Sequence, residues 1–127
     1  MDARSLLALQ HVEPDLVKVI TRAYGDGSLF EVIHGIRTRE EEQALVKGGH
    51  STTLHSRHLP DKRGFAAAVD VVALENGHIS WDPNLYKFIN EAVQQSSHYL
   101  QVPVEWGGDW LTFKDLGHFQ LPWAQYP

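Results

Sequence analysis

The first half of the chain alternates apolar and polar positions in a pattern that predicts helices separated by one strand. Ser5 stands before a run of leucines that suits a short helix, and Pro14 suits the first turn of a second helix that ends before Gly25. Residues 29–34 read as a strand, after which Thr38 caps a third helix that begins with acidic residues and stops at two glycines. We expect the first two helices to pack together.

The second half predicts a sheet and one long helix. Residues 50–65 are polar and turn-rich and read as a long loop, which in compact domains is typically functional or disordered. A buried strand follows at 68–74, an Asn-Gly hairpin turn at 76–77, and a helix at 82–98 with an apolar inner face. Two short strands would complete an antiparallel sheet, at 102–106 and 117–121. Helices and strands in mixed order with hairpin-like connections predict an α+β fold.

Length and charge limit the class of protein. A length of 127 residues predicts a single domain, residues 1–127, whose core needs no disulfide. We expect its helices to flank the sheet. The net charge of −5 and the lack of a Lys/Arg cluster argue against nucleic acid as a partner, because phosphate binding depends on clustered basic side chains. There is no cysteine, so a metal site would have to use His and carboxylate ligands. We expect a monomer.

The apolar runs of the chain predict no insertion into a membrane. The apolar stretch within the first residues is too short for a signal peptide, and no segment approaches the roughly 20 apolar residues of a membrane span. We therefore expect the chain to be made as a soluble cytoplasmic protein.

The best single indication of a functional site is Asp70, which lies in the middle of an apolar, β-branched run. A carboxylate buried there is destabilised by the loss of its hydrating water unless it is paired or coordinates a metal. A partner such as Arg57 or Arg63 would explain Asp70 without a site. Asp70 alone does not decide between these interpretations.

Two histidines and a second acid change the balance. His118 alternates with Gln120 on one face of a predicted strand, so a rigid element would direct its imidazole, and Asp115 lies just before that strand. Together with His58, the imidazole of His118 and the carboxylate of Asp70 would bind zinc and leave its fourth position open for water. Asp115 could then act as a general base, or it could merely cap a turn.

Three short motifs in this order resemble a known family. They are Ser56-Arg-His58, Ala68-Val-Asp70 and Asp115-Leu-Gly-His118. The chain resembles the small phage endolysins of the zinc-dependent peptidase family that includes L-alanyl-D-glutamate endopeptidases and D-alanyl-D-alanine carboxypeptidases and dipeptidases. The likeness covers nearly the whole chain and extends to further segments: Val12-Glu-Pro-Asp-Leu-Val, Gly35-Ile-Arg-Thr with Gln43, Ser51 to His58, and Glu105-Trp-Gly-Gly-Asp-Trp.

The resemblance implies a role for each matched residue. His58, Asp70 and His118 would be the zinc ligands. Asp115 would accept a proton from the attacking water and pass it to the leaving amine. Arg37 would reach the scissile carbonyl or a substrate carboxylate, a role that suits its planar set of donors.

Other assignments have simpler competitors. Arg37 could instead be a surface residue paired with Glu40 or Glu41. Three residues are candidates for shaping the substrate cleft, although a loop hydrogen bond, a position on a helix surface or a place in the core would also explain them: Ser56, Gln43 and Trp106.

The chain departs from the family pattern between the first two ligands. Residues 59–65 enlarge the gap between His58 and Asp70, and Ala66 occupies a position where many relatives have glycine. Relatives often carry a histidine where this chain has Ala67. Strand alternation places residue 67 on the face opposite Asp70, so we expect only a modest effect on activity.

The sequence therefore predicts a zinc metallopeptidase, an endolysin that hydrolyses the L-Ala–D-Glu bond of peptidoglycan stem peptides. Without a signal peptide it would remain in the host cytoplasm until a holin released it to the cell wall. The enzyme alternative is a D-Ala-D-Ala carboxypeptidase or dipeptidase. Non-enzymatic alternatives are a zinc-containing module that binds the cell wall and a structural zinc site with His55 as fourth ligand.

Overall fold

A computed structural model describes residues 1–25, 29–48 and 56–127 of the chain. In order along the chain, its elements are α1 (Ala3–Ala8), α2 (Pro14–Tyr24), β1 (Phe30–His34), α3 (Arg39–Lys47), β2 (Ala68–Glu75), β3 (His78–Ser80), α4 (Pro83–Leu100), β4 (Glu105–Trp106), the 3-10 helix η1 (Gly107–Asp109) and β5 (His118–Gln120). No helix within the described ranges is long and apolar enough to cross a membrane.

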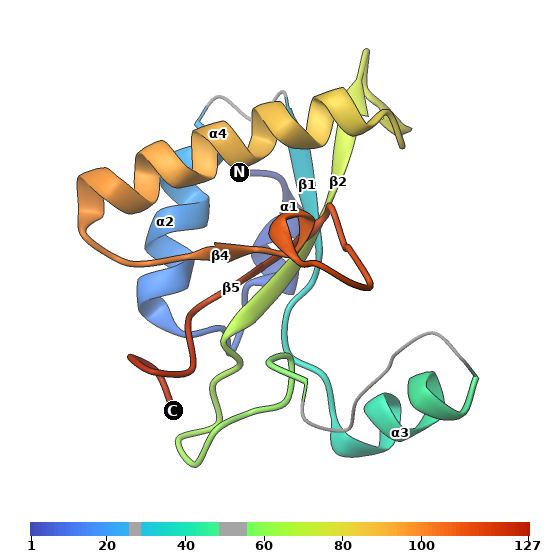
Figure 1. Cartoon of the computed structure of the whole chain (residues 1–127), viewed down its shortest axis with the longest axis vertical. Coiled ribbons are helices and arrows are strands. Elements are labelled where there is room, and N and C mark those ends of the chain that lie inside the picture. The colour runs from blue at the N-terminus through green and yellow to red at the C-terminus, as the bar shows by residue number, and fades with distance from the viewer. Residues whose placement is uncertain (26–28, 49–55) are drawn as a thin grey trace.

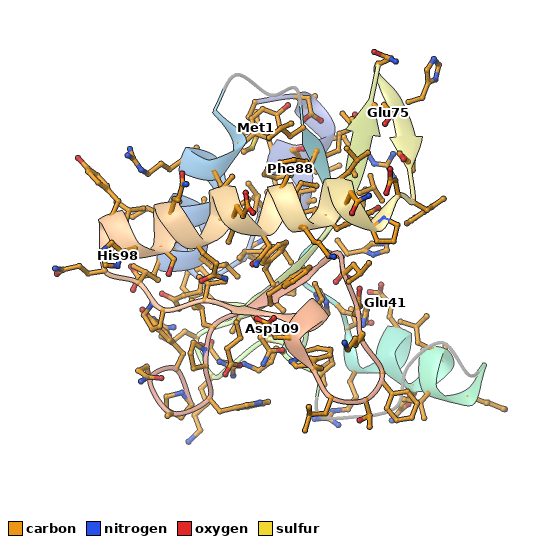
Figure 2. The ribbon with its side chains drawn as sticks, turned by 45° about the horizontal axis from the view of Figure 1, so that its top comes forward. Met1, Glu41, Glu75, Phe88, His98 and Asp109 are labelled. Atoms are coloured by element: carbon orange, nitrogen blue, oxygen red, sulfur yellow. The ribbon has the colours of Figure 1, made fainter. Side chains whose placement is uncertain are left out.

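The strands form one antiparallel sheet with helices packed against it. Its order is β1-β2-β5-β4, and β3 pairs with the far end of β2. Helix α4 crosses the domain beside α2, whereas α3 lies apart from the sheet (Figure 1). Figure 2 shows Phe88 and His98 along α4, with Asp109 of η1 below that helix. The structure confirms the predicted small α+β domain with an antiparallel sheet.

Local sequence signals explain several element boundaries. Thr38 and Glu41 form a reciprocal capping box at the start of α3, which satisfies two backbone N–H groups that the helix leaves free. Asn76 and Gly77 both adopt positive φ, 52° and 78°, as a tight hairpin turn between β2 and β3 requires. The Asp82 side chain caps α4.

The first helix differs from the prediction. It begins at Ala3, because the Asp2 carboxylate rather than Ser5 accepts the free N–H at its start. Ser5 is fully buried, where its hydroxyl donates to Asp2 and accepts the N–H of Val32 at 3.0 Å. Its hydroxyl therefore ties α1 to β1. We expected α1 and α2 to pack together, but the main contact of α1 is with β1 and that of α2 is with α4.

The C-terminal strands are shorter than predicted. Strand β4 has only Glu105 and Trp106, and residues 102–104 are irregular. Pro103 has no N–H to donate to a strand ladder, which accounts for the late start. Strand β5 nevertheless keeps the predicted direction and pairing, and Phe119 and Leu121 are fully buried in the core.

Candidate metal centre

Strands β2 and β5 bring a carboxylate and an imidazole face to face. Asp70 and His118 are direct partners in the antiparallel register, so their side chains leave the same face of the sheet. Nδ1 of His118 lies 3.1 Å from Oδ1 of Asp70. The Asp70 side chain is 18% exposed and that of His118 is 7% exposed, so the pair sits just below the surface.

His58 reaches the same carboxylate from an irregular segment that the backbone holds in place. Its Nε2 lies 3.2 Å from Oδ2 of Asp70. On the other side of the ring, Nδ1 donates to the carbonyl oxygen of Gly35 at 2.7 Å. The His58 carbonyl accepts the N–H of Arg37, and the Ser56 hydroxyl accepts the N–H of His58. These bonds fix both the position and the orientation of the imidazole.

Gly35 is part of this support because of its size. A Cβ atom there would lie 2.1 Å from the carbonyl oxygen of Ala8 and 2.7 Å from a methyl group of Val12. Only glycine lets the chain pass this close to α1, and the position of its carbonyl sets the position of His58.

The donor set fits zinc. His58, Asp70 and His118 each offer one ligand atom, and these atoms lie within 4.8 Å of one another. In the part of the chain that the structure describes, this is the one such group of His and acidic residues. Two imidazoles and a carboxylate are ligands typical of zinc sites that keep an open position. A carbonyl oxygen accepts and never donates, so neutral His58 has its proton on Nδ1 and its lone pair on Nε2.

The electrostatics of the site centre on Asp70. Burial alone would raise the pKa of Asp70, but its interactions with His118, His34 and His58 hold it well below its ordinary value. Burial would likewise lower the pKa of His118, yet the bond to Asp70 and the Asp70 charge raise it. Asp70 is therefore an anion that attracts cations, as a carboxylate must be to bind a metal.

His34 was not recognised in the sequence as a neighbour of this site. Its Nδ1 lies 3.6 Å from Oδ2 of Asp70, and its side chain is 61% exposed. A register shift between Val32 and His34 pairs His34 with Asp70 across the ladder. Such a bulge redirects the side chains that follow it. No sequence pattern in the strand at 29–34 signals the bulge.

Asp115 stands beside the three ligands without belonging to them. Its carbonyl accepts the N–H of His118. A Cβ atom on Gly107 would lie 3.2 Å from Cβ of Asp115 and 3.1 Å from Cβ of His118, so these two side chains start side by side. One carboxyl oxygen accepts the N–H of Gly117 at 3.3 Å, a long and weak contact. Although Asp115 as a residue is exposed, burial of its carboxyl and the charge of Asp70 raise its pKa.

The Arg37 side chain turns inward. It is 15% exposed, and a guanidinium nitrogen lies 3.7 Å from Oδ2 of Asp70. Glu41, one of the partners considered for it, is occupied by the capping box with Thr38. The two arginines considered as partners of Asp70 bind elsewhere. Arg57 donates to the carbonyl oxygens of Leu121 and Tyr126, and Arg63 binds Glu13 and Asp61.

The three residues expected to shape a substrate cleft have different environments. Ser56 supports the backbone of His58, as described above. Gln43 is exposed on α3. Trp106 is only 8% exposed, packs in the core and donates its indole N–H to the carbonyl of Leu116 at 2.7 Å. Trp110 was not singled out in the sequence, but its ring lies 5.0 Å from that of His118.

Two remaining sequence expectations fall outside the cluster. His55, the rival fourth ligand, lies outside the described residues, as does His50. Ala67 lines a separate cavity of about 450 Å³, shared with Arg57 and Tyr126. This placement agrees with the expectation that residue 67 points away from Asp70.

Comparison with known proteins identifies the family. Residues 1–119 match the family model described as phage L-alanyl-D-glutamate peptidase. The L-alanyl-D-glutamate peptidase of Listeria phage A118 is 28% identical over 113 residues, which cover 86% of this chain. This chain spans only 36% of that relative's length.

A solved structure is similar over the entire chain. The crystal structure of the L-Ala D-Glu endopeptidase ChiX of Serratia marcescens superposes with a TM-score of 0.89 at 41% sequence identity. The match covers 100% of this chain and 92% of that one. Since the family model and this neighbour both match far more than half of the chain, the chain belongs to the phage L-alanyl-D-glutamate peptidase family.

Proposed function

We propose that this chain is a zinc peptidase that hydrolyses the amide bond between L-Ala and D-Glu in peptidoglycan stem peptides. The observation that carries the proposal is a cluster of three convergent side chains that could hold a metal, with a second carboxyl, that of Asp115, beside it. A structural zinc site is closed by four protein ligands and needs no neighbouring base. The names of the matched family and of the Serratia and Listeria phage relatives support the choice of bond.

His58, Asp70 and His118 would hold the metal, and zinc suits these ligands best. When bound, zinc supplies Lewis acidity toward the carbonyl oxygen and makes water a nucleophile near neutral pH. The chain's own residues must then orient the substrate and move protons.

Asp115 is the proposed general base. Its carboxyl lies next to the ligands, and its contact with the Gly117 N–H is long and weak, so it can accept a proton from the attacking water. Its raised pKa makes the carboxylate a stronger base than an ordinary aspartate and brings it closer to the neutral pH at which a general base works best. The same carboxyl would deliver that proton to the amine of D-Glu as the amide bond breaks.

Arg37 is proposed to stabilise the developing oxyanion or to bind a substrate carboxylate. Its guanidinium is largely buried within 3.7 Å of Asp70, so it carries a fixed positive charge at the edge of the site. Ser56 would contribute by holding His58, and Trp106 by packing beneath the loop before His118. Gln43 would meet the substrate from α3.

We also propose that a single domain, acting as a monomer, is sufficient for this reaction. If it acts as the phage endolysins of its family do, it would accumulate in the host cytoplasm and reach the peptidoglycan after release by a holin. Neither nucleic acid nor membrane insertion has a role in this account.

Product analysis tests the proposal. Zinc-loaded protein is incubated with purified peptidoglycan, and the new termini are identified by mass spectrometry. We expect products with a free L-Ala carboxyl and a free D-Glu amine, and no release of D-Ala. Release of D-Ala would instead support a carboxypeptidase or dipeptidase. Zinc-loaded protein that leaves the stem peptide intact would contradict an enzymatic function.

A further inference from the structure

A row of hydrogen-bonded polar side chains leads from His118 away from the other two metal ligands. Nε2 of His118 lies 2.8 Å from Oε1 of Gln120, and the amide nitrogen of Gln120 lies 3.1 Å from a carboxylate oxygen of Glu105. Gln120 and Glu105 are direct partners across the β4–β5 ladder, and Gln120 is 8% exposed. Neighbouring strands therefore hold all three groups in line.

The Glu105 end of this row of side chains determines the direction of its hydrogen bonds. An ionised Glu105 carboxylate only accepts hydrogen bonds, so the amide NH₂ of Gln120 must face it. The amide oxygen then faces His118 and also only accepts, which requires a proton on Nε2 of the imidazole. A proton kept on Nε2 leaves Nδ1 as the nitrogen whose lone pair a metal can take.

We propose that Gln120, oriented by Glu105, is a positioning residue that keeps a proton on Nε2 of His118 and presents Nδ1 to the metal. The proposal rests on the metal centre proposed above. It adds two residues that touch neither metal nor substrate in that account. Glu105 acts only through Gln120.

The arrangement at His118 is the reverse of that at His58. His58 donates from Nδ1 to the Gly35 carbonyl and turns Nε2 inward, whereas His118 donates from Nε2 and turns Nδ1 toward Asp70. The two rings stand nearly perpendicular, with centroids 5.2 Å apart. Loss of the Gln120 acceptor would allow the His118 ring to turn over, which would point carbon instead of Nδ1 at the metal position.

The first experiment measures zinc affinity by competition with a chromogenic chelator. Gln120→Leu should bind zinc about 10- to 100-fold more weakly than the parent, the loss typical when a partner of a metal-bound histidine is removed. Gln95→Leu is the matched control, because Gln95 is exposed on α4. Glu105→Gln, at an exposed residue that leaves the core intact, should give a smaller loss.

An exchange of the two side chains separates positioning from packing. The double variant Gln120→Glu with Glu105→Gln places an acceptor-only carboxylate next to His118 and an amide donor beyond it. This variant should recover most of the lost zinc affinity. Gln120→Glu alone should not, because two carboxylates would then face each other across the strands.

Nuclear magnetic resonance supplies the second readout. In the zinc-loaded protein with ¹⁵N-labelled histidine, the parent and the exchanged pair should show a slowly exchanging proton on Nε2 of His118. In Gln120→Leu that proton should exchange rapidly or disappear.

Equal zinc affinity in Gln120→Leu and Gln95→Leu, with the Nε2 proton still protected, would overturn the proposal. If Gln120→Leu fails to fold in a melting test, an unchanged affinity and proton signal in Glu105→Gln would overturn it equally. A parent protein that binds no zinc would contradict the proposed metal centre itself, and that result is obtained before any variant is compared.

Discussion

The candidate site has two halves that the fold supports in different ways. The strand half consists of Asp70 on β2 and His118 on β5, which face each other in the ladder. The loop half consists of Gly35, Arg37 and His58, which lie outside helices and strands and depend on hydrogen bonds between them. Sheet register brings the two side chains of the strand half together, whereas individual hydrogen bonds bring the loop half to the site.

The two halves differ in how easily a single substitution displaces a ligand. The positions of the two strands are fixed by several ladder hydrogen bonds and by buried neighbours, including the fully buried Val69 and Phe119. In the loop half, His58 Nδ1 relies on one carbonyl oxygen, and the position of that oxygen relies on a glycine. We therefore expect small backbone shifts in the loop half to disturb the metal site more than comparable backbone shifts within the strands.

The largest effect is expected where the halves meet, at Asp70. Asp70→Asn removes the charge that faces His58, His118 and Arg37, so zinc should be lost. Since a metal contributes several kcal/mol to such a reaction, peptidoglycan hydrolysis should fall by more than about 10³-fold. Elemental analysis and a hydrolysis assay test this, with Asp82→Asn as control because asparagine caps a helix as well as aspartate. Full zinc occupancy in Asp70→Asn would show that Asp70 does not hold the metal.

Asp115→Asn should separate chemistry from metal binding. Asparagine has nearly the same shape but cannot take up a proton, so activity should fall about 10²- to 10⁴-fold while zinc content and melting temperature stay near those of the parent. Asp109→Asn, at an exposed aspartate of η1, is the control. Hydrolysis within a few fold of the parent would show that Asp115 only caps a turn.

Arg37→Ala tests the loop half for a role in catalysis. Loss of one group that stabilises an oxyanion should lower turnover by about 10²-fold and leave zinc bound. Arg39→Ala, at an exposed position on α3, should retain the parent's turnover. If the Arg37 variant instead turns over normally, its guanidinium is not needed to stabilise the oxyanion.

Gly35→Ala tests the support of His58 directly. The added methyl group would overlap the Ala8 carbonyl and push the Gly35 carbonyl away from Nδ1 of His58. Zinc affinity should fall about 10- to 100-fold, as it does when an outer partner of a metal ligand is lost. Chelator competition measures this, and Ile36→Ala at the exposed neighbouring residue should bind zinc like the parent. Unchanged affinity in Gly35→Ala would remove the distinction between the halves.

The same division explains how far the sequence could predict the site. Asp70 stood out because a carboxylate within an apolar strand demands a partner, and the alternation of His118 with Gln120 indicated a directed imidazole. His58 has no comparable pattern around it, and the resemblance of Ser56-Arg-His58 to a family motif is what favoured it as a ligand.

Other features could not be predicted because they depend on tertiary contacts. The bulge that places His34 next to Asp70 follows from how β1 and β2 pair, and nothing in residues 29–34 marks it. The need for glycine at 35 arises from α1, which is distant in sequence. The start of the first helix was misjudged for a related reason, since Ser5 serves the contact with β1 instead of the cap.

The central claim is that ligands from both halves hold one catalytic zinc, and anomalous diffraction at the zinc edge from crystals of the zinc-loaded protein tests it most directly. We predict one peak at about 2 Å from Nε2 of His58, an oxygen of Asp70 and Nδ1 of His118, with water at the remaining position. A fourth protein ligand in place of water, or a peak away from either half, would contradict the account.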